Sequence, residues 1–356
     1  MNQHITVIVN PASGSADENF RETVEQALRE RGAEYEIRET TPDLDAGVIA
    51  AEAVRDGAEH LMACGGDGTV MAVINGVGKS DHGAEANSTG PRATLSIVPG
   101  GTANLVAGAL GLPAEPGDAV GVAVAGDDRL VDLGQCGEHL FALGLGLGLT
   151  ERLVSQTSAQ EKEKLGKLAY VKAMLREMGA RPVGFTFKLD NQPEQTQRGV
   201  ALVVANAGQI GGGLHFAPDA KMDDGRLDLC ILHRFYVRDL VRMVWASLLG
   251  RLPEDRAVSF YQARRIEIRS DPPLDLQIDG EEVDMVTPLI AEVLPGALRV
   301  RVPVPQNDAD QPDSAIAEAG AATVEAARRN PLPAALLGVA ALAGAVLLWR
   351  VLRRRR

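Results

Sequence analysis

The first 135 residues alternate between short apolar runs, mostly β-branched, and stretches with apolar residues at helical spacing. The apolar runs are Ile5–Asn10, Glu34–Arg38, His60–Cys64 and Thr94–Val98. A helical pattern follows each run, as at Phe20, Val24 and Leu28 after the first. Strands that alternate with helices pair in parallel, because each helix crosses over the sheet before the next strand begins. The alternation predicts a Rossmann-like α/β domain over residues 1–135, with ligands at the carboxyl ends of its strands.

Glycine and small hydroxyl residues follow all four predicted strands. The loops are Asn10-Pro11-Ala12-Ser13-Gly14, Thr40-Thr41, Gly65-Gly66-Asp67-Gly68-Thr69 and Pro99-Gly100-Gly101-Thr102-Ala103-Asn104. Glycine lets the backbone come close to a ligand, and a helix N-terminus presents unpaired N–H groups to an anion. Four such loops at one sheet edge predict a phosphate-binding crevice. Neither GxxxxGK[ST] nor GxGxxG follows the first strand, so a P-loop or an NAD-type Rossmann site is not indicated.

A carboxylate at Asp67 is unusual in an anion-binding loop, because it would repel phosphate. One interpretation is that Asp67 meets a metal-bound phosphate or polarises an attacking hydroxyl. The other is that Asp67 caps the helix that follows it. The loop by itself leaves both interpretations open.

After residue 135 the pattern changes to short, often alternating runs separated by Gly, Pro, Asp and Asn. The runs are Phe185–Leu189, Gly199–Ala205, Leu227–Leu232, Ser259–Arg269, Leu274–Ile278 and Leu298–Val302. Such runs are typical of antiparallel strands, and they predict a β-rich domain over residues 136–303. Two helical patterns interrupt this domain, at Gln160–Met178 and Val237–Leu249.

Two acidic stretches of the second domain could carry chemistry. Asp219, Asp223 and Asp224 lie before Gly225, which suits an oxygen-preferring cation such as Mg²⁺ or Ca²⁺, or simply an Asp-Gly hairpin turn. The second stretch, Gln277–Glu282, is a strand that runs into an acidic turn. A glutamate there could act as a general base or be solvated.

Composition narrows the function classes. With 356 residues the chain is long enough for two domains, and its net charge of −12 argues against a nucleic-acid partner. The three cysteines are scattered and odd in number, which favours a reducing, cytoplasmic compartment. Its six histidines have no zinc or catalytic-triad spacing, and no signal peptide pattern begins the chain.

The last part of the chain predicts a linker and a membrane-associating tail. Residues 304–330 are rich in Pro, Ala and acidic residues and are typical of a solvated linker. Residues 331–356 contain sixteen uncharged, mostly apolar residues, Ala334–Trp349, followed by Arg350 and Arg353–Arg356. As a helix the apolar stretch would be about 24 Å long, slightly short of the ~30 Å bilayer core. We expect the protein to lie at the cytoplasmic side of the cell membrane. The sequence leaves open whether the tail is a helix that spans the bilayer or one that lies in its interface.

Several ordered motifs resemble the bacterial diacylglycerol kinase and sphingosine kinase-related lipid kinase family. They are Asn10-Pro11-x-Ser13-Gly14, Gly65-Gly66-Asp67-Gly68-Thr69 with Asn75-Gly76, Pro99-x-Gly101-Thr102-x-Asn104, Gly211-Gly212-Gly213 with Ala217-Pro218-x-Ala220-x-x-x-Asp224-Gly225, and Asp279-Gly280-Glu281. Together they cover residues 4–303 in the family's order, although GGDGT alone is shared with NAD kinases. The resemblance implies an ATP-binding Rossmann-like domain and a β-sandwich domain, with a lipid hydroxyl entering between them. It also implies that the chain end returns to the first domain.

The resemblance assigns roles to individual residues. Nucleotide contacts fall on Asn10, Pro11, Ser13, Gly14, Thr40, Thr41, Gly65, Gly66, Asp67, Gly68, Thr69, Val70 and Thr102. A structural Mg²⁺ falls on Asp224, with main-chain oxygens near Lys221 and Arg226. Glu281 takes the proton-acceptor position, and Asp67 belongs to the network of Mg²⁺ and water near the phosphates.

The predicted function is an ATP- and Mg²⁺-dependent lipid kinase that phosphorylates a hydroxyl of diacylglycerol or a related long-chain lipid in a membrane. One departure is that the family often reads Gly-x-Gly-x-Asp-Ala where this chain has Thr150 and Glu151. Because of Thr150, a non-catalytic nucleotide-binding regulator is one alternative. An NAD kinase-like enzyme acting on a soluble dinucleotide is the other. Oligomeric state is left open, with a homodimer as one option.

Overall fold

The computed structural model describes residues 4–11, 18–82, 91, 93–148, 181–208, 217, 219–233 and 258–304, with the backbone alone at 79–82. All of them belong to one compact unit, Met1–Phe235 with Glu254–Val304. The predicted helices at 160–178 and 237–249 lie outside the described residues, as do the linker and tail beyond residue 304.

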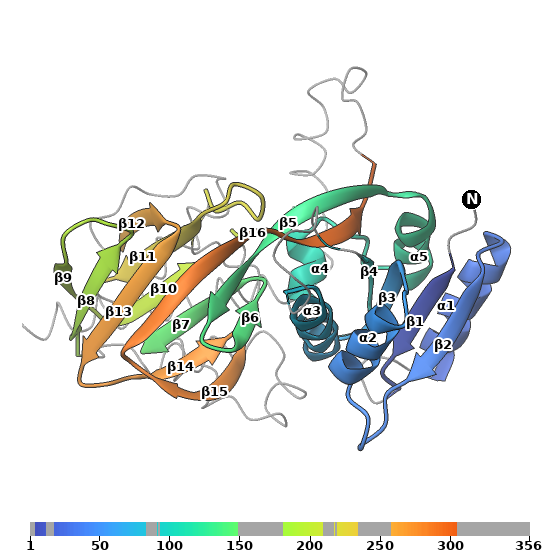
Figure 1. Ribbon diagram of the computed structural model, residues 1–356, viewed down its shortest axis with the longest axis horizontal. Helices are drawn as coiled ribbons and strands as arrows, with labels where there is room; N and C mark the ends of the chain where they lie inside the picture. The colour runs from blue at the N-terminus through green and yellow to red at the C-terminus, as the bar shows by residue number, and fades with distance from the viewer. Residues whose placement is uncertain are drawn as a thin grey trace, which may run out of the picture. The chain divides into compact units, whose positions relative to one another are not determined.

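The first part of this unit is a parallel sheet with helices on both faces (Figure 1). Its elements are β1 (Ile5–Val9), α1 (Glu18–Glu30), β2 (Tyr35–Glu39), α2 (Ala46–Arg55), β3 (His60–Gly65), α3 (Asp67–His82), β4 (Thr94–Pro99), α4 (Leu105–Ala109) and α5 (Pro116–Ala125). Strand β1 lies between β2 and β3, β4 lies beside β3, and all of these pairs are parallel. The Rossmann-like α/β prediction is confirmed.

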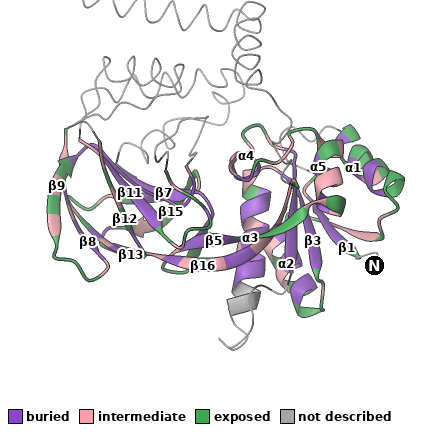
Figure 2. Ribbon diagram, turned by 90° about the horizontal axis from the view of Figure 1, so that it is seen from above, coloured by how far each residue is buried: buried purple, intermediate pink, exposed green. Residues whose placement is uncertain are grey.

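Alternate residues of each central strand face opposite layers, so that both faces are apolar. Ile8 packs with α2 and α3, whereas Val7 and Val9 pack with α1 and α5. Figure 2 shows β1 and β3 buried along their length. A strand covered on both faces has a continuous apolar sequence, which explains why these strands were visible in the sequence.

The second part is a β-sandwich, as predicted. Its strands are β5 (Asp127–Cys136), β6 (His139–Phe141), β7 (Gly144–Gly148), β8 (Val183–Leu189), β9 (Gln195–Gly199), β10 (Ala201–Ala205), β11 (Leu227–Leu232), β12 (Val258–Ala263), β13 (Arg265–Asp271), β14 (Asp275–Ile278), β15 (Glu281–Val286) and β16 (Leu289–Val302). One sheet has the order β12-β11-β10-β7-β14-β15, and the other contains β16, β13, β8 and β9. Large apolar side chains from both sheets, among them Phe185, Leu202 and Ile266, fill the space between them.

Strands β5 and β16 are shared between the two parts. Near its start β16 pairs with β13, and near its end Arg299 and Val300 pair in parallel with Thr94 and Leu95 of β4. Strand β5 is antiparallel to β16 along almost its whole length. The α/β sheet and one sheet of the sandwich are therefore a single ten-stranded sheet.

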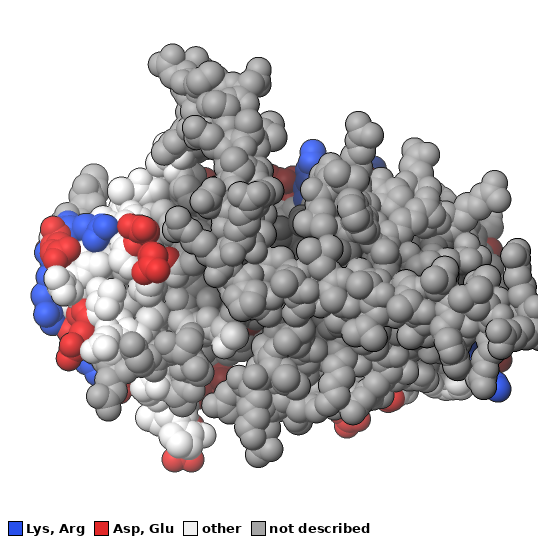
Figure 3. Space-filling view, turned by 180° about the vertical axis from the view of Figure 1, so that it is seen from behind, with Lys and Arg blue, Asp and Glu red and all other residues white. Residues whose placement is uncertain are grey.

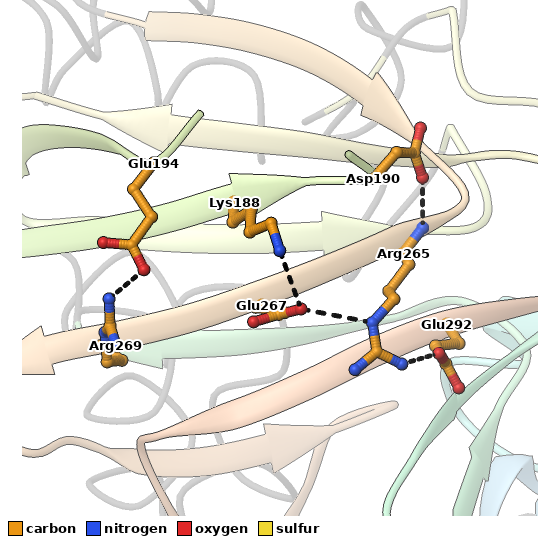
Figure 4. A network of polar contacts seen from close by, with 7 residues as sticks. All are labelled: Lys188, Asp190, Glu194, Arg265, Glu267, Arg269 and Glu292. Carbon is orange, nitrogen blue, oxygen red and sulfur yellow. Dashed lines mark hydrogen bonds and ion pairs between the residues drawn. The ribbon is translucent and has the colours of Figure 1, made fainter. Parts of the chain in front are cut away.

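The outer face of that sheet carries charged side chains in cross-strand pairs (Figure 4). Arg265 bonds Glu292 on β16 and lies 3.4 Å from Glu267, which lies 3.8 Å from Lys188 on β8. Arg269 bonds Glu194, which lies in the turn between β8 and β9. Pairs of opposite charge on neighbouring strands stabilise the register and keep this face solvated.

Three details differ from the sequence-based prediction. The predicted strand Ser259–Arg269 is two strands, β12 and β13, because the chain changes sheets at Arg264. Pro42 suits the first turn of a helix and predicts a start there, but helix α2 begins at Ala46, since Asp45 is its N-cap and accepts from the Gly47 amide at 2.7 Å. Strand β5 and helix α5 were not predicted.

The expected membrane location is corrected here. Across the part of the chain that the structure describes, no helix is both long and apolar enough to cross a bilayer. The expected C-terminal hydrophobic helix at 331–356, on which that location depended, lies outside the described residues. A location on the cytoplasmic side of the membrane is therefore not retained.

Candidate nucleotide and catalytic site

Backbone hydrogen bonds bring the strand-end loops together at one edge of the α/β sheet. The Thr40 amide donates to Val9 O at 3.0 Å and the Asn10 amide to Cys64 O at 3.2 Å. The Gly100 amide donates to Gly65 O at 2.8 Å. These bonds join the ends of β1, β2, β3 and β4 in turn, so the four loops border one edge as the alternation predicts.

Two of the loops touch where glycine is required. A Cβ on Gly101 would lie 2.6 Å from the Gly66 Cα, and a Cβ on Gly65 would lie 2.7 Å from Thr69 Oγ1. A side chain at Gly101 would push the two loops apart, and one at Gly65 would clash with Thr69 of the same loop. The close approach leaves backbone N–H groups near the start of α3, where an anion can be bound.

Thr69 and Val70 hold the loop after β3 in shape. The Thr69 side chain is buried and its hydroxyl accepts from Asn10 Nδ2 at 3.0 Å, so it fixes the first loop against the third. Val70 is 3% exposed and packs in the core, and its amide donates to Gly66 O at 3.0 Å. Both residues therefore shape the loop, and their predicted nucleotide contacts stay a prediction.

Asp67 is the first residue of α3, and its carboxylate reaches a second helix. Its Oδ1 accepts from the Val106 amide in the first turn of α4 at 3.2 Å. The N-cap residue of α4, Asn104, has left-handed backbone and makes no cap bond, because its side chain bonds the Gly101 amide and carbonyl instead. Partial burial raises the pKa of Asp67, while hydrogen bonds from this turn oppose the rise.

Glu281 lies over the first turn of α3. A Cβ on Gly68 would be 3.2 Å from Glu281 Oε1, although the two residues are more than 200 positions apart in the sequence. Glu281 is exposed and is the first residue of β15. The structure thus brings together Asp67 and Glu281, the two residues to which the family pattern gives catalytic roles.

Asp279 fixes the turn that carries Glu281; the sequence showed it as part of the Asp-Gly-Glu motif but assigned it no role of its own. Its carboxylate accepts from the amides of Ala142, Leu143 and Gly144 at 2.8, 2.9 and 2.8 Å. Its φ is +47°, in the left-handed region that aspartate tolerates. Burial raises the pKa of Asp279 to about 6, and the nearby Asp67 carboxylate adds to the rise.

A buried pair, Asp132 and Asn206, extends this framework. The Asp132 carboxylate accepts from the Gly225 amide at 2.6 Å and from the Gly296 amide at 2.8 Å. The Asn206 side-chain amide donates to the carbonyls of Asp132 and Ala142, both at 2.8 Å. Sequence reasoning missed both residues; the only signal was an aspartate inside the apolar run around Asp132.

The aspartates of the predicted metal loop, Asp219, Asp223 and Asp224, are exposed. Asp224 Oδ1 accepts from the Arg226 amide at 3.0 Å, whereas Asp223 pairs with Arg129 at 2.6 Å. Partial burial raises the pKa of Asp228, and the charges of Asp224 and Asp219 add to the rise. Among the described residues, no group of three or more His, Cys, Asp or Glu is placed to hold a metal ion.

The other predicted site residues lie on the loops themselves. Pro11, Thr41 and Thr102 are exposed there, and Lys221 and Arg226 are exposed on the metal loop. Ser13, Gly14, Thr150 and Glu151 lie outside the described residues.

Comparison with known proteins matches both halves of the chain. Residues 4–136 match the diacylglycerol kinase catalytic domain, and residues 148–302 match the YegS C-terminal NAD kinase beta sandwich-like domain. The diacylglycerol kinase of Bacillus subtilis is 30% identical over 312 residues, which cover 86% of this chain and 98% of that protein. The chain belongs to the family of diacylglycerol kinases and YegS-like lipid kinases.

Other members of the family agree with this assignment. A Chromohalobacter salexigens protein named "Probable lipid kinase YegS-like" is 33% identical over 300 residues, 83% of this chain and 92% of that protein. A diacylglycerol kinase structure from Bacillus anthracis has 26% identity and a TM-score of 0.70, covering 84% of this chain and 97% of that one. This member of the diacylglycerol kinase family is therefore a phosphotransferase with an alcohol group as acceptor.

Proposed function

We propose that this family member transfers the γ-phosphoryl group of ATP to a hydroxyl of diacylglycerol or a related long-chain lipid in a membrane. The observation that carries the proposal is the approach of the Glu281 carboxylate to the first turn of α3, beside Asp67. The relatives' names supply the lipid class, since an acidic residue at a phosphate loop fits several acceptors.

The proposed reaction needs three things of the protein. The glycine-rich loops bind the phosphates through backbone N–H groups, at the edge where Gly66 and Gly101 meet. Glu281 accepts the proton of the lipid hydroxyl as that hydroxyl attacks in line. Asp67 would help to hold Mg²⁺ near the phosphates, and the ion would supply positive charge that offsets the charge of the transferred group.

A second Mg²⁺ role is proposed at the loop of Asp224. One carboxylate together with main-chain oxygens near Lys221 and Arg226 is a donor set that suits a hard cation. A cation there would hold the loop in place, and it lies outside the proposed transfer step. Heating curves with Mg²⁺ and with a chelator test this role, because a bound cation raises the melting temperature of wild type but not of Asp224→Ala.

Incubation of the purified protein with γ-labelled ATP, Mg²⁺ and vesicles containing diacylglycerol tests the main proposal. Label in a product extracted with the lipids is expected. Label in a dinucleotide when NAD replaces the vesicles would instead support the NAD kinase-like alternative. Nucleotide binding without any labelled product would support the non-catalytic regulator.

Glu281→Gln is the matched variant for this assay, with Glu282→Gln as its control. The two glutamates are adjacent, exposed and on the same strand, but of the two only the Glu281 carboxylate lies close to Gly68. If both variants retain full activity, Glu281 is not the base and the proposed mechanism is wrong.

A further inference from the structure

The proposed nucleotide site contains carboxylates but needs positive charge. Asp67, Asp279 and Glu281 gather at one corner, and ATP adds several negative charges of its own. In the described parts of the four strand-end loops no Lys or Arg is present. Backbone N–H groups and Mg²⁺ supply part of the balance, so a neighbouring element is the place to look for a basic side chain.

Arg21 lies at the correct edge of the sheet. It is in the first turns of α1, next to Phe20, whose ring would be 2.7 Å from a Cβ on Gly100. Its guanidinium Nη1 bonds the carboxylate of Glu39, the last residue of β2 and the neighbour of Thr40. Arg21 thus bonds the end of β2, and Phe20 beside it lies against the loop that follows β4.

The other arginines of the described helices and of β2 are directed elsewhere. Arg29 bonds Glu25, Arg38 bonds Glu36, and Arg31 and Arg55 bond carbonyls of their own helices. Arg38 also lines a 390 Å³ cavity together with Asp56 and Glu59, at the amino end of the strands. At the left of Figure 3, acidic and basic groups lie next to one another.

We propose that Arg21 binds a phosphate group of the nucleotide and that Glu39 holds Arg21 in place while the site is empty. The inference rests on the proposed function, since it takes the nucleotide to bind at this edge. On binding, Nη1 exchanges the Glu39 carboxylate for phosphate oxygens, and no covalent bond changes.

The bonds around Arg21 make such an exchange feasible. Its Nε donates to Glu25 Oε1 at 2.8 Å, which keeps the side chain directed along the helix while its terminal nitrogens can turn. The Arg21 and Glu39 side chains are 50% and 40% exposed, and an exposed ion pair is weak and easily replaced. A planar guanidinium can in turn make two parallel hydrogen bonds to a phosphate, which a lysine cannot.

The test is direct binding of ATP and of adenosine to Arg21→Gln, Arg21→Lys and Glu39→Gln, measured by calorimetry. We expect Arg21→Gln to weaken ATP binding about tenfold or more and to leave adenosine binding unchanged, with Arg21→Lys in between. Glu39→Gln removes the competing carboxylate and should strengthen ATP binding about two- to fivefold.

Arg29→Gln is the matched control, because Arg29 bonds the same Glu25 but lies two turns further along α1. It should bind ATP as wild type does. Equal ATP affinity of Arg21→Gln and wild type, or equal weakening in Arg21→Gln and Arg29→Gln, would overturn the inference. Since binding is read without turnover, a protein that binds ATP through Arg21 but labels no lipid would contradict the proposed function and leave the inference standing.

Discussion

The Asp67 carboxylate on α3 accepts a hydrogen bond from the Val106 amide on α4, and so takes the place of the cap that Asn104 does not provide. A residue that the family pattern places in the phosphate network thus also holds the start of a neighbouring helix. The sequence left open whether Asp67 acts at the phosphates or caps a helix, and the two roles are compatible. The helix it caps is α4, and not α3 as expected.

This double role predicts that Asp67→Ala and Asp67→Asn differ in stability. Asp67→Ala removes the acceptor and should lower the free energy of unfolding by about 1 kcal/mol, whereas Asp67→Asn keeps an oxygen for Val106 and should lose less. Urea denaturation measures the difference. Both variants should lose phosphotransfer, and equal stability of the two would show that the bond to Val106 contributes nothing.

Glu281→Gln should reduce turnover by roughly 10²-fold or more, because the amide cannot accept the hydroxyl proton. ATP affinity should change little, since the loops bind the phosphates. Rates with vesicles and calorimetry with ATP separate the two effects. Weakened ATP binding together with unchanged turnover at saturating ATP would contradict this role.

Asp279 should make stability fall as the pH rises through its titration range. Its carboxyl has a pKa of about 6 in the folded protein and 3.8 ordinarily, so the folded state binds the proton more tightly. Stability from this group is complete below about pH 4 and is lost towards pH 6, by up to about 3 kcal/mol. Unfolding of wild type and Asp279→Asn at pH 4 to 7 measures the difference, which should depend on pH.

The titration of His60 should make stability rise with pH, which is the opposite of the effect of Asp279. Burial, together with the charge of Arg301, lowers the pKa of His60 from 6.5 to about 4. The folded state therefore favours the neutral ring, which bonds Ser96 Oγ at 2.8 Å. The contribution of His60 to stability is therefore complete above about pH 6.5 and is lost as the pH falls towards 4. A His60→Gln variant should flatten this acid limb, and an unchanged acid limb would contradict the assignment.

Asp132→Ala should be strongly destabilising, by about 3 kcal/mol. It would leave the amides of Gly225 and Gly296 without the acceptor they have here, and each such loss costs about 1–3 kcal/mol. Asp132→Asn keeps one oxygen and should fall between alanine and wild type. Thermal melting of wild type and the two variants checks this order of stability. Equal stability of the asparagine and alanine variants would show that the hydrogen bonds of Asp132 contribute nothing.

The strands of the α/β sheet were predictable because burial on both faces gives each one a continuous apolar sequence. Strand β5 was not predicted, and only the end of β16, Leu298–Val302, was visible in the sequence, since each pairs with a partner more than 150 residues away and β16 is irregular between Leu294 and Leu298. Their pairing depends on tertiary contacts that local patterns do not record.

The residue types of the site were predictable from the sequence. The hydrogen bonds that hold those residues in place were not. Glycine loops and the Asp-Gly-Glu turn are visible as motifs, and the structure brings Asp67 and Glu281 together. Which amides the Asp279 carboxylate meets depends on the register of β14 against β7, where Ile278 lies opposite Leu145. A motif contains no information about that register.

The position of β16 has a consequence for the order in which the protein folds. During synthesis β4 leaves the ribosome about two hundred residues before Arg299 and Val300, its partners on β16. Until then the nascent α/β sheet has an open, apolar edge, which is a site for pairing with other chains. Folding of the first region alone should therefore give an aggregation-prone intermediate, and a polypeptide released before residue 299 should depend on chaperones to stay dispersed.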